Sequence, residues 1–276
     1  MIFAGKTLDL STPKVMGILN VTPDSFSDGG RFNQLDHALQ QAQSMLDEGA
    51  DFIDVGGEST RPGAAQVSVQ QELDRVVPVI EAISSNFDTL ISIDTSKAVV
   101  MAEAVKAGAV LINDVRALRE DGALAAAAAS NAAVCLMHMQ GQPRTMQHSP
   151  HYDDLIDDIS DFFRQRIRAC DSAGISQEKI LLDPGFGFGK TLQHNYLLLN
   201  KLEHFQQLGC PLLVGMSRKS MLGKLLNNEV AERLAGSLAC ATIAAFKGAQ
   251  IIRVHEVGPT VDALKVVQAT LNPQEL

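Results

Sequence analysis

The sequence alternates eight times between a short apolar run and a longer stretch of helix-forming residues. The apolar runs are nearly continuous in hydrophobic residues, as in strands that are buried on both faces. Strands that alternate with helices form a parallel sheet through right-handed crossovers. At 276 residues, eight such units indicate an α/β fold that closes into a (β/α)8 TIM barrel rather than an open sheet.

The boundaries of the apolar runs give the expected elements. The expected strands are Val15–Asn20, Phe52–Gly56, Leu90–Asp94, Val110–Asp114, Ala133–His138, Ile180–Asp183, Pro211–Gly215 and Ile251–His255. The expected helices are Leu35–Glu48, Ser68–Ser85, Lys97–Ala107, Asp121–Ser130, Tyr152–Ala173, Leu192–Leu208, Ala231–Lys247 and Glu256–Leu271. The opening MIFAGKTLDL is expected to form a short β-hairpin that plugs the barrel bottom. No linker divides the chain, so residues 1–276 are expected to form a single domain.

Composition excludes several classes of protein. The formal net charge of −9 argues against a general nucleic-acid binder, because such a protein needs a basic surface. The N-terminus lacks the pattern of a signal peptide, and no apolar run is long enough to span a bilayer. The four cysteines form neither a CxxC pair nor a zinc pattern. We therefore expect a soluble cytoplasmic protein that binds neither nucleic acid nor membrane.

Every predicted strand delivers a polar side chain to its carboxyl end, which is where barrel enzymes carry their active sites. At any one such position a helix cap and a functional group have roughly even odds. Eight positions around one mouth are hard to explain as caps, because clustered charges there are costly without a ligand. The residues are Asn20, Asp54, Asp94, Asn113, Asp114, His138, Asp183, the SRKS segment 217–220, Arg253 and His255.

Two long segments follow strands at the same end. They are VTPDSFSDGGRFNQ (21–34) after the first strand and GESTRPGAAQV (57–67) after the second. Both are rich in Gly, Ser, Asp and Pro, so we expect mobile loops rather than regular elements. Long loops at a barrel mouth are commonly lids or binding loops, and an idle surface loop is the alternative.

The segment LLDPGFGFGKTL (181–192) combines a strand with a glycine-rich turn. A P-loop needs four residues between its glycines, whereas three separate Gly185 from Gly189. The alternating glycines also miss the dinucleotide-binding pattern, which belongs to a first βαβ unit. We expect the glycines to let the backbone pass close to a flat ligand beside the two phenylalanines. Asp183 would then accept parallel N–H bonds from an amino-pyrimidinone edge.

Eight stretches of the chain are similar to those of the dihydropteroate synthases, the folate-pathway enzymes. They are MGILNVTPDSFSDGG (16–30), DVGGESTRPGA (54–64), SIDTSK (92–97), INDV (112–115), MHMQGQPRTMQ (137–147), LDPGFGFGK (182–190), GMSRKS (215–220) and RVHEV (253–257). The resemblance covers nearly the whole chain. It implies a (β/α)8 barrel, usually a homodimer, whose family is a target of sulfonamides.

The resemblance also implies a transferase reaction. (7,8-Dihydropterin-6-yl)methyl diphosphate is joined to 4-aminobenzoate, giving 7,8-dihydropteroate and diphosphate, with Mg²⁺ accompanying the diphosphate. Asp94, Lys219 and Arg253 would be catalytic, with Asp94 facing the ring N–H that gains positive charge as diphosphate departs. The pterin diphosphate site would comprise Thr60, Asp94, Asn113, Met137, Asp183, Phe188, Lys219, Arg253 and His255.

The remaining implied roles concern the metal and the second substrate. Asn20 would supply an oxygen ligand to Mg²⁺. The 4-aminobenzoate site would be built from Phe26, Thr60, Arg61, Pro62 and Ser220, with Ser220 starting a short helix whose N-terminus suits a carboxylate. No general base is assigned, because an arylamine is already a neutral nucleophile. His138 is expected to be structural.

Three alternatives stay open on the sequence. A pterin-dependent methyl-transfer domain shares the Asp and Asn that hold the pterin, but it lacks the STRPG loop and needs a corrinoid partner. A non-catalytic pterin-binding paralogue would have lost lid or diphosphate residues, and none is missing. A phosphate-binding structural barrel would explain the cations but not three carboxylates. The intact STRPG and SRKS segments favour the synthase.

Overall fold

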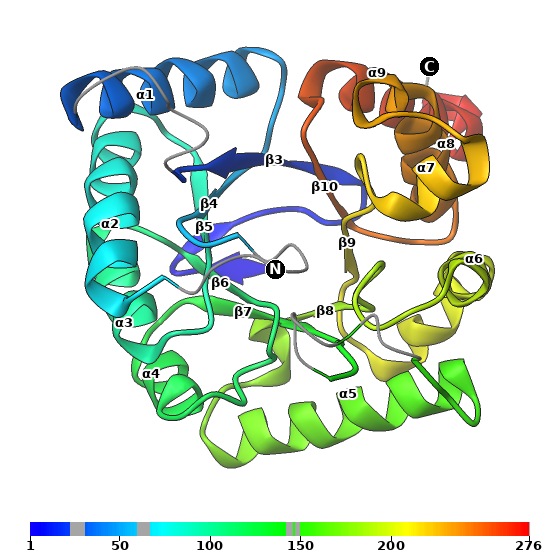
Figure 1. Ribbon diagram of the computed structural model, residues 1–276, viewed down its shortest axis with the longest axis horizontal. Helices are drawn as coiled ribbons and strands as arrows, with labels where there is room; N and C mark the ends of the chain where they lie inside the picture. The colour runs from blue at the N-terminus through cyan, green and yellow to red at the C-terminus, as the bar shows by residue number, and fades with distance from the viewer. Residues whose placement is uncertain (23–30, 60–66, 142–145, 147–149, 276) are drawn as a thin grey trace.

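The computed structural model is a barrel of parallel strands enclosed by helices (Figure 1). It describes residues 1–22, 31–59, 67–141, 146 and 150–275. Across these residues the strand order is β8-β7-β6-β5-β4-β3-β10-β9. A parallel bridge between Leu182 and Leu212 joins the two ends of the sheet, so the barrel closes. The predicted (β/α)8 fold is confirmed.

The barrel strands begin and end within about two residues of their expected bounds. They are β3 (Lys14–Asn20), β4 (Phe52–Gly56), β5 (Leu90–Asp94), β6 (Leu111–Asp114), β7 (Ala133–Met137), β8 (Ile180–Asp183), β9 (Leu213–Val214) and β10 (Ile251–Val254). The helices are α1 (Arg31–Asp47), α2 (Val69–Asn86), α3 (Ala98–Ala107), α4 (Ala123–Ala129), α5 (Leu155–Ser172), α6 (Leu192–Asn200), α7 (Ser220–Leu226), α8 (Leu234–Phe246) and α9 (Val257–Leu271).

Four helix boundaries differ from expectation by three residues or more, and one of them is the start of α8 at Leu234 rather than Ala231. Helix α1 begins at Arg31, inside the segment expected to be a loop, because no helix-breaking residue follows Gly30. Helix α5 begins at Leu155 because the Asp154 side chain caps it, accepting hydrogen bonds from the backbone amides of Ile156 and Asp157. The stretch expected as one helix over Leu192–Leu208 divides at Lys201, which leaves helical geometry, and continues as a 3₁₀ helix.

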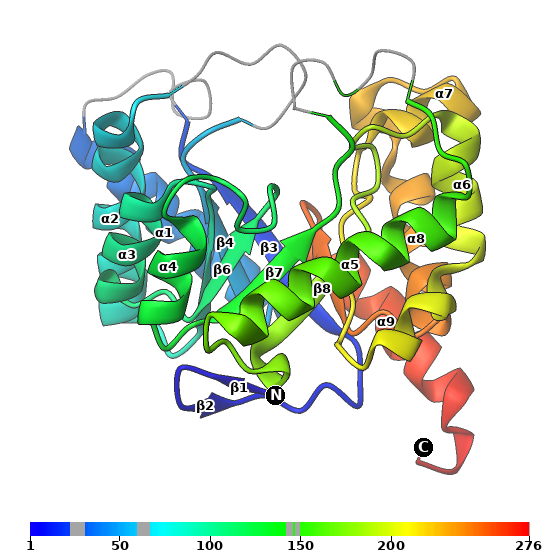
Figure 2. The same cartoon turned by 90° about the horizontal axis from the view of Figure 1, so that it is seen from below.

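The N-terminal hairpin closes the amino end of the barrel, as predicted. Strands β1 (Ile2–Phe3) and β2 (Lys6–Thr7) pair antiparallel below the sheet (Figure 2). Phe3 is fully buried, and its ring meets that of Phe52 edge to face with centroids 5.1 Å apart. The plug packs against the apolar side chains at the starts of the strands, including Leu111 and Leu181.

Strand alternation decides which side chains enter the barrel. In β4, Phe52 belongs to the cluster inside the barrel, whereas Ile53 and Val55 belong to the cluster between sheet and helices. Successive side chains of a strand point to opposite faces, so Asp54 and Gly56 share the interior face with Phe52. The same two-residue step leads from buried apolar residues to the polar residues at the strand ends.

Candidate active site

A row of polar residues crosses four adjacent strands at one height near the carboxyl end of the barrel. Strand pairing aligns Asn20 with Gly56, Gly56 with Asp94, and Asp94 with Asn113. A side chain at Gly56 would occupy the space inside this row, because an added Cβ would lie at ordinary contact distance, 3.6 Å, from both Asn20 Oδ1 and Asp94 Cβ. Glycine therefore leaves space between the amide and the carboxylate, where a ligand can enter.

Arg253 on β10 reaches across the barrel to two carboxylates. Its Nε donates to Asp54 Oδ2 at 2.6 Å, and its Nη2 donates to Asp94 Oδ2 at 2.9 Å. The Asn113 amide donates weakly to Asp54 Oδ2 at 3.4 Å. Gly215, directly after β9, lies beside Arg253, where an added Cβ would be in ordinary contact, 3.6 Å from Arg253 Cβ. The four polar residues form one connected network in the upper barrel.

Asp54 lies in the site, although its strand-end position in the sequence predicted no particular role for it. It is completely buried, and it is the closest carboxylate to the Arg253 guanidinium. The available signal was a charged residue inside an otherwise apolar strand, two positions after the buried Phe52. An acid on that face must be paired, since an unpaired buried charge is very costly.

The electrostatics of this network depend on burial. Burial raises the pKa of Asp94 to about 7; Arg253 opposes the shift, and the nearby Asp54 adds to it. Burial alone would lower the pKa of Arg253, but Asp54 and Asp94 outweigh it and raise the pKa above its ordinary value. Arg253 therefore stays cationic, and Asp94 titrates near neutral pH.

A second group of residues gathers around the glycine-rich turn after β8. Asp183 Oδ1 accepts a hydrogen bond of 2.8 Å from the Gly185 amide. Lys219 donates to the Phe186 carbonyl, and its Nζ lies 4.7 Å from the centroid of the Phe188 ring. Met137, which pairs with Asp183 across the strands, packs in the same apolar cluster as Phe188.

Asp183 and Lys219 influence each other as a buried acid and a buried base. Burial raises the pKa of Asp183, and Lys219 opposes this shift. Burial lowers the pKa of Lys219 to about 8, and Asp183 opposes that shift. A ligand that offers N–H donors to the acid and acceptors to the ammonium would satisfy both groups.

Two glycines of this turn lie against the protein's own backbone. Gly185 has φ +72°, and an added Cβ would lie 1.9 Å from the carbonyl oxygen of His138. Gly189 has φ +63°, and its Cβ would lie 2.6 Å from the carbonyl oxygen of Gln140. At these two positions glycine is required by the close approach of the protein's own backbone after β7, and the expected approach of the turn to a flat ligand stays a prediction.

Two of the strand-end residues have structural contacts. His138 is buried, and its Nδ1 lies 3.0 Å from Lys190 Nζ; burial and then Lys190 hold its pKa well below the ordinary value. A neutral, buried imidazole agrees with the structural role expected for it. Asp114 accepts hydrogen bonds from the amides of Arg116 at 2.8 Å and Leu118 at 2.7 Å, which orders the turn after β6.

His255 follows β10 and is held by the loop after β9. Its Nδ1 lies 2.9 Å from Ser217 Oγ, and that hydroxyl donates to Glu256 Oε2 at 3.1 Å. Since the hydroxyl proton goes to Glu256, Nδ1 of His255 carries the proton toward Ser217. Ser220 is the exposed first residue of α7, next to Lys219 at the helix cap.

The structure thus brings the described candidates to one end of the barrel. These are Asn20, Asp94, Asn113, Met137, Asp183, Phe188, Lys219, Ser220, Arg253 and His255. The other predicted site residues, Phe26, Thr60, Arg61 and Pro62, lie outside the described residues.

Charged residues outside the predicted site hold the two ends of the 57–67 segment. Lys97, at the start of α3, forms ion pairs with Glu58 and with the buried Glu72 of α2. Glu58 Oε1 also accepts from the Val67 amide at 3.3 Å. Glu58 therefore ties the beginning of the 57–67 segment to its end.

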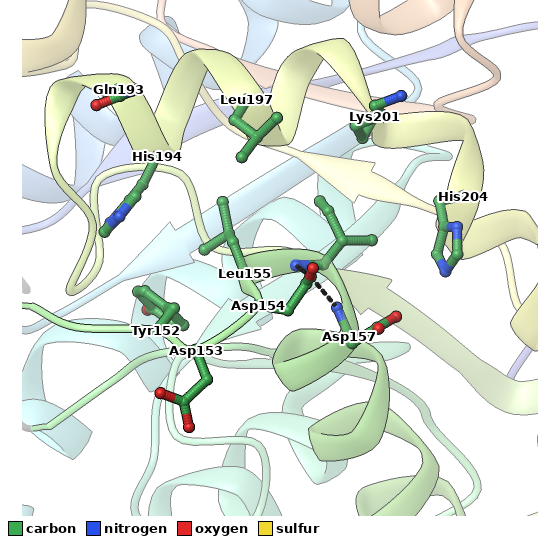
Figure 3. Close-up of a pocket in the computed structure, with 11 residues that line it drawn as sticks. Tyr152, Asp153, Asp154, Leu155, Asp157, Gln193, His194, Leu197, Lys201 and His204 are labelled. Atoms are coloured by element: carbon green, nitrogen blue, oxygen red, sulfur yellow. Dashed lines mark hydrogen bonds between the residues drawn. The ribbon is translucent and has the colours of Figure 1, made fainter.

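A cavity of about 570 Å³ lies elsewhere, against the outer helices α5 and α6 (Figure 3). None of the predicted site residues lines it. Its Asp154 carboxylate already caps α5, accepting from Ile156 N at 2.9 Å and Asp157 N at 3.0 Å.

Within the described part of the chain, no three His, Cys, Asp or Glu side chains are arranged to hold a metal ion. No helix in the described ranges is long and apolar enough to cross a membrane.

Known proteins share both the sequence and this geometry. Residues 16–255 match the family described as pterin binding enzyme. The dihydropteroate synthase of Escherichia coli K12 is 60% identical over 271 residues, which cover 98% of this chain and 96% of the relative. A solved structure of the Yersinia pestis dihydropteroate synthase with a sulfonamide drug has a TM-score of 0.95 at 63% identity, covering 99% of each chain. The Xanthomonas albilineans dihydropteroate synthase with 4-aminobenzoic acid has a TM-score of 0.92 at 48% identity, covering 98% of this chain and 97% of that one.

Proposed function

The chain belongs to the dihydropteroate synthases of the pterin-binding enzyme family, and on this premise we propose how its residues share the work of the reaction. The enzyme joins (7,8-dihydropterin-6-yl)methyl diphosphate to 4-aminobenzoate and releases 7,8-dihydropteroate and diphosphate. The observation that carries the residue assignment is the convergence of Asp94, Asp183, Lys219 and Arg253 at one end of the barrel.

Asp183 binds the hydrogen-bond donors of the pterin ring, and Lys219 binds its acceptors. Asp183 accepts from the 2-amino and N3–H groups, with Asn113 beside it as a neighbour that both donates and accepts. Lys219 exchanges its bond with the Phe186 carbonyl for the pterin carbonyl and ring nitrogen. Met137 and Phe188 supply the apolar wall of the pocket. The opposing pKa shifts of the acid and the ammonium support this pairing with a neutral, bifunctional ring edge.

Asp94 and Arg253 act on the charge that develops during the reaction. The C–O bond at the pterin methylene breaks, and its electron pair leaves with diphosphate. The resulting cation spreads over the dihydropterin, where the fixed Asp94 carboxylate stabilises it. The arylamine lone pair then forms the new C–N bond, and its proton passes to water. Arg253 and His255 bind the departing diphosphate, and Arg253 also lies over the ring.

Asn20 is the proposed protein ligand of Mg²⁺. Magnesium commonly takes one or two protein oxygens and completes its coordination with phosphate oxygens and water. The side-chain oxygen of Asn20 lies at the strand end beside Gly56 and Asp94, which fits that use. When bound, the ion neutralises charge on the diphosphate leaving group.

The 4-aminobenzoate site is proposed to include Ser220 with Phe26, Thr60, Arg61 and Pro62. Ser220 supports this placement because it is exposed beside Lys219 at the barrel mouth. The complex of the Xanthomonas relative with 4-aminobenzoic acid supports the substrate, and the sulfonamide complex of the Yersinia relative supports sulfonamide binding.

We also infer a homodimer from the distribution of exposed apolar side chains. Of the twelve large hydrophobic side chains that are exposed among the described residues, eight lie between residues 225 and 271. They belong to neighbouring elements around α7, α8 and α9 (Figure 1). Such a concentration is typical of an interface. Sedimentation of the purified protein as a monomer at micromolar concentration would contradict this inference.

Product formation tests the proposed function directly. The purified protein is incubated with the pterin diphosphate, 4-aminobenzoate and Mg²⁺, and dihydropteroate and diphosphate are both measured. We expect the two products in equal amounts and only when all three components are present. Binding of the pterin without coupling would instead favour a binding paralogue or a methyl-transfer relative.

A further inference from the structure

Lys190, the last residue of the glycine-rich turn, is buried behind the pterin pocket and has no role in the mechanism above. The residue is 3% exposed. The ammonium lies 2.9 Å from the Gly185 carbonyl, 3.1 Å from the Phe188 carbonyl and 3.0 Å from Nδ1 of His138. The His138 carbonyl lies 3.5 Å away as a fourth acceptor, so the ammonium donates only to neutral groups.

A buried ammonium of this kind is costly, so its presence needs a reason. Burial lowers the pKa of Lys190 to about 7, and Asp183 opposes the shift. A methionine would fill similar space without the desolvation penalty. Filling the core between the helices and the sheet therefore does not account for a lysine here, whereas its hydrogen bonds do.

The acceptors of Lys190 belong to two different loops of the pocket. His138 follows β7, and Gly185 and Phe188 belong to the turn after β8. Gly185 connects Lys190 to Asp183, because its amide donates to the Asp183 carboxylate while its carbonyl accepts from Lys190. The turn is also held from outside, where Tyr152 donates to the Gly189 carbonyl at 2.7 Å.

Two lysines thus hold the carbonyls of this turn. Lys219 binds the Phe186 carbonyl next to the ring of Phe188. Lys190 binds the carbonyls of Gly185 and Phe188. The bonds of Lys190 to Gly185 and Phe188 lie on either side of Phe186 in the chain and do not depend on the bond of Lys219.

We propose that Lys190 is a positioning residue for pterin binding, which fixes the turn so that Asp183 and Phe188 are in place before the substrate arrives. The inference rests on the proposed function, since it assumes that Asp183 and Phe188 contact the pterin. A site held in its binding geometry loses less conformational freedom on binding. Loss of Lys190 should therefore weaken pterin binding without changing the reacting groups.

The test compares Lys190→Met with the exposed Lys201→Met as a matched control. Removing a charged hydrogen-bond donor is expected to raise KM for the pterin diphosphate about tenfold in Lys190→Met. The turnover at saturating pterin and the KM for 4-aminobenzoate should stay within about twofold, because the lost energy is uniform binding energy. Lys201→Met should match the wild type in every parameter.

A purely structural lysine would give a different pattern. In that case Lys190→Met would lower the melting temperature while KM for the pterin stayed at the wild-type value, which overturns the proposal. If Lys190→Met does not fold, Lys190→Gln and the milder Tyr152→Phe are measured in the same way, and an unchanged KM in both is equally negative. A wild-type protein that forms no dihydropteroate refutes the proposed function itself, whereas an active wild type with an unaffected variant refutes only the role of Lys190.

Discussion

Asp54→Asn separates the charge of the buried acid from its size and hydrogen-bonding capacity. The substitution keeps an oxygen that can accept from Arg253 Nε, now 2.6 Å from Asp54 Oδ2. It removes one of the two negative charges that hold the guanidinium, leaving Asp94 as the other. Since Asp54 and Asp94 are like charges that share one cation, the substitution should affect both neighbours.

The size of the effect follows from the kind of bond that changes. Exchanging a charge-assisted hydrogen bond for a neutral one costs about 1–2 kcal/mol. If Arg253 binds the diphosphate in the transition state, kcat/KM should fall about five- to thirtyfold. Asp54→Ala leaves Arg253 Nε without a buried partner. It should lower the free energy of unfolding by about 3–5 kcal/mol.

The pH dependence of kcat/KM gives a second, independent test of the coupling between Asp54 and Asp94. Asp94 stabilises a cation only when it is ionised, and its pKa is raised to about 7 by burial with Asp54 contributing. The kcat/KM of the wild type should therefore rise with pH through about 7. Asp54→Asn removes the like-charge contribution, so this acid limb should move to lower pH while the plateau falls.

The assay is steady-state dihydropteroate formation from pH 5.5 to 9 for wild type, Asp54→Asn and a control. Asp88→Asn is the control, since its exposed carboxylate pairs with Lys6 at the other end of the barrel. A plateau equal to that of the wild type would show that Asp54 does not hold Arg253 in its working position. An acid limb that stays in place or moves to higher pH would refute the proposed coupling between Asp54 and Asp94.

Four further predictions concern single positions. Asp94→Asn should keep the fold and lose about 10²- to 10³-fold in turnover, as expected for a group that stabilises developing charge; unchanged turnover removes Asp94 from the mechanism. Arg61→Ala should weaken 4-aminobenzoate use more than pterin binding, and titrations showing equal or opposite effects would contradict the loop assignment. Gly185→Ala should lower the melting temperature far more than Gly174→Ala, because only the first added Cβ meets a backbone oxygen, at 1.9 Å; both positions have positive φ. The kcat/KM for the pterin should fall as pH rises through about 8, where Lys219 loses its proton, and an alkaline limb that persists in Lys219→Met would belong to another group.

Local patterns predicted the strands well and some local details poorly. Hydrophobic runs placed β4, β5 and β8 at their observed bounds, because burial on both faces is written into consecutive residues. The predicted start of α1 and the prediction of one continuous helix over Leu192–Leu208 were wrong, since helix ends depend on caps and packing more than on composition. The glycines of the turn after β8 were correctly separated from a P-loop, but their packing against the backbone near His138 was not predictable from spacing.

The sequence alone determined which chemical groups reach the mouth of the barrel. Each strand ends in a polar residue, and the two-residue alternation of a strand decides the face on which that residue lies. The partners of those groups were decided only by tertiary structure. Arg253 meets Asp54 across 199 positions of the chain, and Lys190 meets His138 across 52. Such pairs form because closure of the barrel brings distant strand ends together, and burial there then shifts the pKa values of Asp94 and Lys219 toward neutrality.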